Sequence, residues 1–187
     1  CVFPKSYQYG NETEPWAYPF KRINDTNDFN QPNLEFFQNF DLRVKKLLDL
    51  GIQADVILFH PYDAWGYSQM GDEMNEKYVR FMMARLSAYR NVWWSLANEW
   101  DIPEIKDSID WEAIGTLLQK EDPHQRLRGI HNWYDSEDHF YDHTQPWITH
   151  TSTQTAQFYN AIKWREQYQK PLLFDEMKYE GDVPSGW

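Results

Sequence analysis

Apolar and polar positions follow two different patterns along this chain, and the two patterns alternate. Apolar residues recur at helical spacing from Leu34 through Phe37 and Val44 to Leu48, and Gly51 follows as a helix-ending glycine. Elsewhere short stretches are continuously apolar, which is typical of buried strands. Helices are therefore predicted over residues 32–51, 72–89, 109–122 and 155–169. Strands are predicted over residues 54–63, 91–99, 125–133, 146–152 and 171–176, and residues 1–5 are interpreted as the end of an earlier strand.

Strands that alternate with helices and are apolar on both faces indicate parallel sheets covered by helices. This pattern fits either an open doubly wound sheet or a (β/α)₈ barrel, the TIM barrel. The glycine-rich phosphate turn that would favour the open sheet follows none of the predicted strands. Polar residues follow them instead, as at the active-site mouth of a barrel. These residues are His60, Tyr62, Asp63, Asn98, Glu99, His131, Asn132, His150, Asp175 and Glu176.

The expected fold class is therefore α/β, of the TIM-barrel type, but incomplete. A barrel of this kind needs about 250 residues, whereas the chain has 187. We expect residues 1–187 to form a single partial catalytic domain, a fragment that spans about strand 2 to just past strand 7.

Composition and charge exclude several classes of partner. There are 18 Lys and Arg residues against 29 Asp and Glu, a formal net charge of −11, whereas binding to nucleic acid or an anionic membrane requires a basic surface. No apolar run approaches the roughly 20 residues of a membrane span. The only cysteine is Cys1, so neither a disulfide framework nor a thiolate metal cluster is expected. No cofactor is predicted, and the compartment, cytoplasmic or exported, stays open.

Aromatic residues are frequent at 18%, with 10 Trp and 12 Tyr. Most are expected in the core, yet several lie beside polar residues at the ends of apolar runs, namely Tyr62, Trp65, Trp100, Trp133 and Tyr179. Indole and phenol rings combine a flat apolar face with a polar edge, and a sugar ring likewise has an apolar face and a polar rim. Carbohydrate is therefore the expected partner.

Two carboxylates, Glu99 and Glu176, stand at the ends of different predicted strands. Hydrolysis of a glycosidic bond requires one carboxylic acid to protonate the leaving group and one carboxylate to attack the sugar or activate water. A single strand-end glutamate would more often form a salt bridge or cap a helix. Two of them, one preceded by Asn98 and both near Trp and Tyr residues, favour glycoside hydrolysis.

Asn98 and Glu99 after one apolar strand, with Glu176 after a later one, resemble the catalytic pattern of clan A glycoside hydrolases. The resemblance extends over nearly the whole chain to a bacterial group of glycoside hydrolases with DUF5060 and DUF5605 domains. The similar segments are FPKSYQYGNETEPWAYPF, LFHPYDAWGYS, YRNVWWSLANEWD, FYDHTQPWITH, WREQYQKPLLFDEMKYEGD and SGW. It implies a retaining glycosidase in which Glu99 is the acid/base, Glu176 the nucleophile, and Asn98 the partner of the sugar 2-hydroxyl.

The segment FDEMKYEG contains three acidic candidates for the nucleophile, Asp175, Glu176 and Glu180. Alternate residues of a strand face opposite sides, so Asp175 and Glu176 are not expected to point into the mouth together. The clan places its nucleophile at the very end of the strand, which favours Glu176. Glu180 falls in the following loop and is expected to bind a substrate hydroxyl or cap a helix.

Three histidines, His60, His131 and His150, follow predicted strands. We expect them to be neutral and to bond sugar hydroxyls or orient the two carboxylates. The alternative is a metal site, as in metal-dependent amidohydrolase barrels, but the chain contains no H-E-x-x-H motif. The other histidines, His124, His139 and His143, fall in predicted loops and are expected in solvent.

Two aromatic side chains complete the predicted site. Trp65 is expected to line the sugar cleft, with packing in the core as the equal alternative. Tyr179 follows Glu176 closely and is expected to donate a hydrogen bond that keeps the nucleophile ionised. Besides hydrolysis, two functions stay open: a metal-dependent amidohydrolase-like barrel, and a non-catalytic barrel that binds carbohydrate without turning it over.

Overall fold

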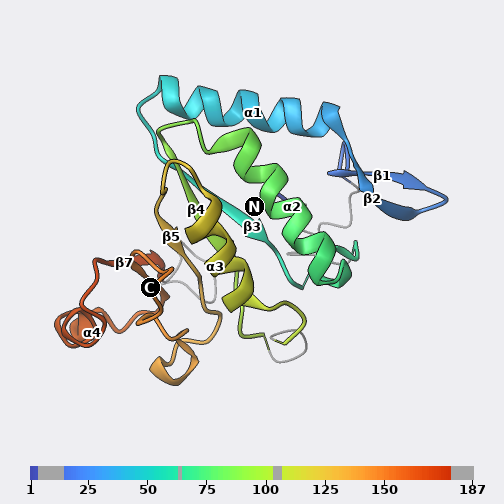
Figure 1. Cartoon of the computed structure of the whole chain (residues 1–187). Coiled ribbons are helices and arrows are strands. Elements are labelled where there is room, and N and C mark those ends of the chain that lie inside the picture. The colour runs from blue at the N-terminus through green and yellow to red at the C-terminus, as the bar shows by residue number, and fades with distance from the viewer. Residues whose placement is uncertain (4–14, 63–64, 103–106, 178–187) are drawn as a thin grey trace, which may run out of the picture.

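The computed structural model, shown in Figure 1, describes residues 1–3, 15–62, 65–102 and 107–177, which form a mixed α/β structure. Its α-helices within these residues are α1 (Leu34–Asp49), α2 (Asp72–Leu86), α3 (Trp111–Glu121) and α4 (Ala161–Tyr168). Its parallel strands are β3 (Ala54–Phe59), β4 (Val92–Ala97), β5 (Arg128–Gly129), β6 (Thr151–Gln154) and β7 (Leu172–Glu176). An antiparallel hairpin of β1 (Phe20–Ile23) and β2 (Thr26–Pro32) precedes them.

The parallel strands lie in the order in which they occur along the chain. Strands β3, β4 and β5 form one sheet, and β6 and β7 form a second. The Thr149 amide donates to the Arg128 carbonyl at 2.9 Å, which joins the two sheets between β5 and β6. On the outer side of β3, the Val2 amide donates to the Ile57 carbonyl at 2.9 Å. The predicted succession of parallel strands and helices is therefore confirmed for the described residues.

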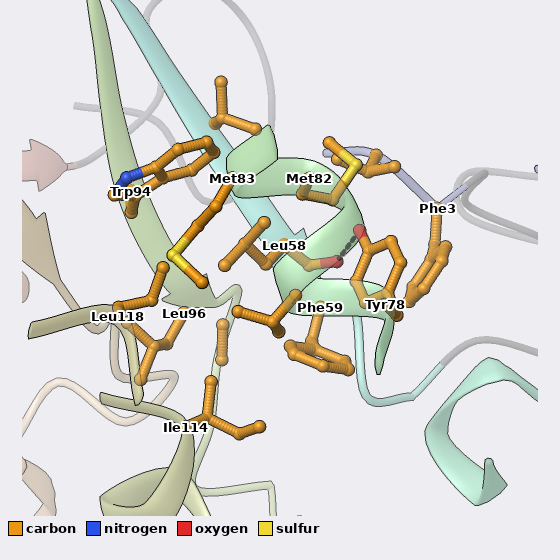
Figure 2. Packing of buried hydrophobic residues seen from close by; sticks show 14 of the residues in the cluster. Phe3, Leu58, Phe59, Tyr78, Met82, Met83, Trp94, Leu96, Ile114 and Leu118 are labelled. Carbon is orange, nitrogen blue, oxygen red and sulfur yellow. Dashed lines mark hydrogen bonds between the residues drawn. The ribbon is translucent and has the colours of Figure 1, made fainter. Parts of the chain in front are cut away.

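The main core lies between the β3–β4–β5 sheet and the helices α2 and α3, which cross in front of these strands in Figure 1. Figure 2 shows the strand residues Leu58, Trp94 and Leu96 packed against Met82 of α2 and Leu118 of α3. All five side chains are completely buried. The other face of β4 is mostly buried as well, which agrees with a strand that is apolar at every position except Ser95.

Both ends of α1 carry residues that favour helix termination, and of these Gly51 was predicted from the sequence. The Asn33 side chain accepts a hydrogen bond from the Glu35 amide at 3.2 Å and so caps the start of α1. After α1, Gly51 has a φ angle of +73°, the left-handed conformation that commonly ends helices. Across the described residues, every helix is too short or too polar to traverse a lipid bilayer.

Three predicted elements differ from the structure in their extent. The strand predicted over residues 125–133 is hydrogen-bonded as a strand only at Arg128 and Gly129. The strand predicted over residues 146–152 begins only at Thr151, because the apolar Trp147 and Ile148 reach the core from a loop. The helix predicted over residues 155–169 is α-helical only from Ala161 to Tyr168 and follows a short 3₁₀ turn.

The β1–β2 hairpin was not anticipated from the apolar pattern, because most residues of β2 are polar and exposed or half-buried. Its turn carries the signal that could have revealed it. Asn24 and Asp25 have φ angles of +50° and +61°, the left-handed conformation that a two-residue hairpin turn requires at both positions. Asn and Asp tolerate this conformation better than most residues.

Candidate active site

The C-terminal ends of the parallel strands carry several of the predicted site residues. His60 follows β3 directly, Asn98 and Glu99 follow β4, and Glu176 is the last residue of β7. The Asn98 amide donates to the Phe59 carbonyl at 3.0 Å, which ties the end of β4 to the end of β3. The predicted positions of these four residues at strand ends are confirmed, whereas their roles stay predictions.

The Asn98 side chain connects Glu99 to the turn after β3. Its Nδ2 atom donates to the Tyr62 hydroxyl at 2.6 Å and to Oε2 of Glu99 at 3.2 Å. The Tyr62 ring in turn packs on His60, with the ring centroids 4.0 Å apart. Since both amide hydrogens of Asn98 bond within the protein, its carbonyl oxygen is the group that it can offer to a sugar hydroxyl.

Glu99 has an unusual backbone conformation. Its φ angle is +58°, in the left-handed region that non-glycine residues seldom occupy. Such a conformation costs on the order of 1–2 kcal/mol relative to the right-handed one. Strained residues of this kind cluster at functional sites, where the backbone aims a side chain in a direction that a relaxed strand end would not give.

His131 lies between two carboxylates from β7. Its Nδ1 atom is 3.0 Å from Oδ1 of Asp175, and its Nε2 atom is 3.4 Å from Oε2 of Glu176 and 2.9 Å from Oε1 of Gln154. Only 6% of the His131 side chain is exposed. Burial by itself lowers the pKa of His131, but the hydrogen bonds and charges of Asp175 and Glu176 outweigh it and raise the pKa to about 10.

His131 is therefore an imidazolium ion at neutral pH, and the prediction that it is neutral is wrong. The sequence could not show that two carboxylates converge on one ring. Burial raises the pKa of Asp175, yet the hydrogen bond and charge of His131 more than offset this and lower it below its ordinary value. The Ser152 hydroxyl donates a further hydrogen bond to Oδ2 of Asp175.

Asp175 and Glu176 both reach His131 because the β6–β7 ladder contains an irregularity. Thr153 lies opposite Phe174, but the next residue, Gln154, lies opposite Glu176, so that Asp175 is an extra residue on β7. Such a bulge breaks the alternation of side chains along a strand. The expectation that the two neighbouring carboxylates could not face the same site is therefore wrong.

His150 is not where the sequence placed it. It precedes β6 rather than ending a strand, because β6 begins at Thr151. Its Nδ1 atom lies 3.0 Å from the Thr149 hydroxyl, and its ring lies edge-on to Trp93 near the start of β4. His150 is thus at the opposite end of the strands from Glu176. Gln154, which sequence reasoning missed, is the residue that ends β6 and faces His131.

The other predicted residues have mixed outcomes. The Trp65 ring packs edge-on against Tyr18, with centroids 5.3 Å apart, which favours its packing role. Tyr179 lies outside the described residues, as do Asp63 and Glu180. His143 is buried rather than solvated, and burial lowers its pKa to about 3.

A buried acidic residue just after Glu99 was also missed. The Asp101 carboxylate accepts hydrogen bonds from the Trp133 and Tyr134 amides at 2.5 and 3.3 Å. Its position two residues after a strand-end glutamate was the available signal. In the part of the chain that the structure describes, no three His, Cys, Asp or Glu side chains are grouped as a metal ion would require.

One protein family matches nearly the whole chain. The model of the family described as "Apiosidase-like, catalytic domain" matches residues 6–187. The chain belongs to this family. The description of the family supports a glycoside hydrolase-like function for the chain. No curated protein sequence matches the chain.

Solved structures of similar fold carry the same general name. A Bacteroides vulgatus ATCC 8482 protein named "putative glycoside hydrolase" superposes with a TM-score of 0.88 and 37% sequence identity. The match covers 98% of this chain but 38% of that protein, so the chain spans well under half of its length.

Two more distant structures are similar in fold alone. A glycoside hydrolase family 5 protein from the same organism has a TM-score of 0.56 at 16% identity, over 78% of this chain and 35% of that one. A third protein, named "Glycoside hydrolase", has a TM-score of 0.58 at 14% identity, over 94% of this chain and 40% of that one.

Proposed function

We propose that the protein cleaves O-glycosidic bonds with retention of configuration, and that this chain supplies both catalytic carboxylates. The observation that carries the proposal is that the strand-end glutamates of β4 and β7 are each fixed by a buried polar partner. Asn98 holds Glu99 at 3.2 Å, and His131 holds Glu176 at 3.4 Å. Two positioned carboxylates are the requirement of glycoside hydrolysis.

In this mechanism Glu176 attacks the anomeric carbon while Glu99 donates its proton to the leaving oxygen. Glu99 then removes a proton from the water that releases the sugar from Glu176. The positive charge of His131 favours the ionised form of Glu176, which is the form that attacks. Asn98 accepts a hydrogen bond from the sugar 2-hydroxyl through its side-chain carbonyl.

The proposed architecture is part of a (β/α)₈ barrel of the kind found in clan A glycoside hydrolases, including those with DUF5060 and DUF5605 domains. Its support is the order of the parallel strands and an open surface beside the last of them, which apolar and polar residues line together. A hollow of about 630 Å³ lies along α4 and β7, and Ile162, which lines it, is 74% exposed. Further chain that continues the barrel would cover this surface.

The first substrates to test are apiosides, since the family description names an apiosidase. Wild-type full-length protein would be assayed on a panel of aryl glycosides that includes 4-nitrophenyl apioside, beside its Glu99→Gln and Glu176→Gln variants. We expect each variant to lose about 10²- to 10⁴-fold in kcat. Glu166→Gln, an exposed glutamate on α4, is the matched control and should retain full activity.

Either of two results would contradict the proposal. Turnover by both variants at the wild-type rate would make the carboxylates structural. Binding of oligosaccharides without turnover of any substrate would favour the non-catalytic barrel instead.

A further inference from the structure

We propose that Trp133 and Tyr134 form an aromatic platform that binds a neutral sugar ring on the leaving-group side of the glycosidic bond. The proposal rests on the proposed function, because it takes Glu99 as the group that protonates the leaving oxygen. It adds a binding site for the part of the glycan that departs.

The platform exposes two large aromatic rings side by side. Trp133 is 40% exposed and Tyr134 is 51% exposed, and their rings are nearly perpendicular, with centroids 5.3 Å apart. Aromatic side chains contribute strongly to the free energy of cores and interfaces because each buries about 150–250 Å². A neighbouring pair left in solvent forgoes that free energy unless a ligand covers it.

A buried carboxylate holds the platform in place. Asp101, with 3% of its side chain exposed, accepts hydrogen bonds from both platform amides, and its Oδ2 atom lies 3.2 Å from Nδ1 of His139. The His139 ring also stacks on Tyr134, with centroids 4.6 Å apart and planes inclined by 26°. Burying a carboxylate is costly unless its hydrogen bonds are satisfied, and here they are satisfied by the backbone of an exposed segment.

The segment is fixed on its other side too. The Asp135 carboxylate accepts a hydrogen bond from the Thr155 hydroxyl. The main-chain carbonyl of Asp135 accepts a second one from Nε2 of Gln157 at 3.2 Å. The platform is thus joined to the chain after β4 through Asp101 and to the chain after β6 through Asp135. A surface held this firmly loses little conformational entropy when it binds a ligand.

The platform follows His131, which contacts Glu176 and whose backbone pairs with the residue after Glu99. The Trp100 amide donates to the His131 carbonyl at 2.9 Å, so the chain after Glu99 runs beside the chain that leads to Trp133. Trp133 is two residues beyond His131, and therefore within about 7 Å of it between Cα atoms. Because the platform is anchored by Asp101, two residues after the proposed acid, we place it on the leaving-group side.

The chemistry of the surface favours a neutral sugar. The apolar face of a sugar ring matches an indole or phenol face. Asp135 lies on the platform segment, Asp101 binds that segment from the chain after β4, and the chain has a net charge of −11, which disfavours a uronic acid or another anion.

The test measures binding in the absence of turnover. Full-length Glu176→Ala protein would be screened on an array of neutral plant and bacterial oligosaccharides, and bound compounds would be titrated by calorimetry. In this background, Trp133→Ala should weaken binding about tenfold or more, the cost typical of removing an aromatic contact. Trp133→Phe should restore most of the affinity. Trp16→Ala is the matched control, since Trp16 is 58% exposed and stacks on Phe36 of α1.

The outcomes separate this proposal from hydrolysis. Equal affinity of the parent and its Trp133→Ala variant, or no binding to any oligosaccharide on the array, would overturn the platform. If binding depends on Trp133 but the wild type hydrolyses nothing, the platform stands and the hydrolytic function fails. If hydrolysis depends on both glutamates while Trp133→Ala binds normally, hydrolysis stands and the platform fails.

Discussion

His131 and Asp175 are joined through Nδ1 and Oδ1 at 3.0 Å although 44 residues separate them in the chain. The opposite ring nitrogen of His131 faces Glu176, so a single imidazolium connects the structural carboxylate to the proposed nucleophile. This arrangement assigns different tasks to two adjacent acidic residues. Asp175 keeps His131 charged, and His131 holds Glu176 in place.

Replacing His131 should impair the chemical step more than substrate binding. His131→Gln removes the positive charge beside Glu176, and we expect kcat to fall roughly 10²-fold, as when other preorganised donors are removed from an active site. KM should change little, which steady-state kinetics would show. A His124→Gln variant, at an exposed position after α3, is the control. A uniform rise in KM with unchanged kcat would instead make His131 a residue that binds sugar.

The same ion should make the stability of the protein depend on alkaline pH. The pKa of His131 is raised from 6.5 to about 10, so the folded state binds a proton that the unfolded state releases above pH 6.5. This contribution is complete below pH 6.5 and is lost as the pH rises through about 10. Thermal unfolding of wild type should therefore show Tm falling by several degrees between pH 7 and 10, with a flatter profile for His131→Gln.

The loss of stability between pH 7 and 10 is assigned to His131 rather than to neighbouring carboxyl groups. Burial, with a further contribution from the charge of Asp175, raises the pKa of Asp55 to about 6. Asp55 therefore changes the stability of the protein only at acidic pH, and it adds no pH dependence between pH 7 and 10. Parallel profiles for wild type and His131→Gln between pH 7 and 10 would show that His131 is not held as an ion.

The left-handed backbone of Glu99 predicts a difference in stability between two variants that lack its carboxylate. Glu99→Ala and Glu99→Gly both remove the carboxylate, but only glycine also removes the Cβ atom that opposes a φ angle of +58°. We expect Glu99→Gly to be more stable than Glu99→Ala by about 1 kcal/mol. Urea unfolding of both variants measures this difference, and a less stable glycine variant would mean that Glu99 is not strained.

A glycine inside α3 predicts a loss of stability where helix propensity predicts a gain. Alanine is favoured over glycine in a helix interior by about 1 kcal/mol, but a Cβ atom at Gly115 would lie 2.2 Å from the Trp147 ring. Since Trp147 is buried, Gly115→Ala should be destabilising by about 1–3 kcal/mol, as overpacked cores are. Thr116→Ala, in the same helix, is the control. A more stable Gly115→Ala protein would contradict the packing described.

Continuous apolar strands were the most informative part of the sequence. Residues 54–59 and 92–97 form β3 and β4 within the predicted ranges, because runs that are apolar at all but one position are typical of strands in a parallel sheet. The strand predicted over residues 146–152 was partly wrong, because this run is also apolar. Trp147 and Ile148 are as buried as strand residues, yet they reach the core from a loop, and apolar content alone does not distinguish the two cases.

The site was predictable in position but not in its interactions. Asn98, Glu99 and Glu176 could be placed at strand ends, since each directly follows or completes an apolar run. The charge of His131 could not be predicted, because it arises from a bulge in β7 that turns Asp175 toward the same ring as Glu176. A bulge depends on the pairing of two strands, and no residue of the segment FDE provides a sequence signal for it.

The most direct test of the proposed mechanism is chemical rescue of the Glu176→Ala variant by azide. Full-length protein would be incubated with an aryl glycoside that the wild type cleaves, with and without azide, and the product identified by NMR. The mechanism predicts that the variant is inactive alone and that azide, which attacks from the vacated side of the sugar, yields a glycosyl azide of inverted configuration. If Glu176→Ala cleaves the substrate at the wild-type rate without azide, Glu176 is not the nucleophile and the central claim fails.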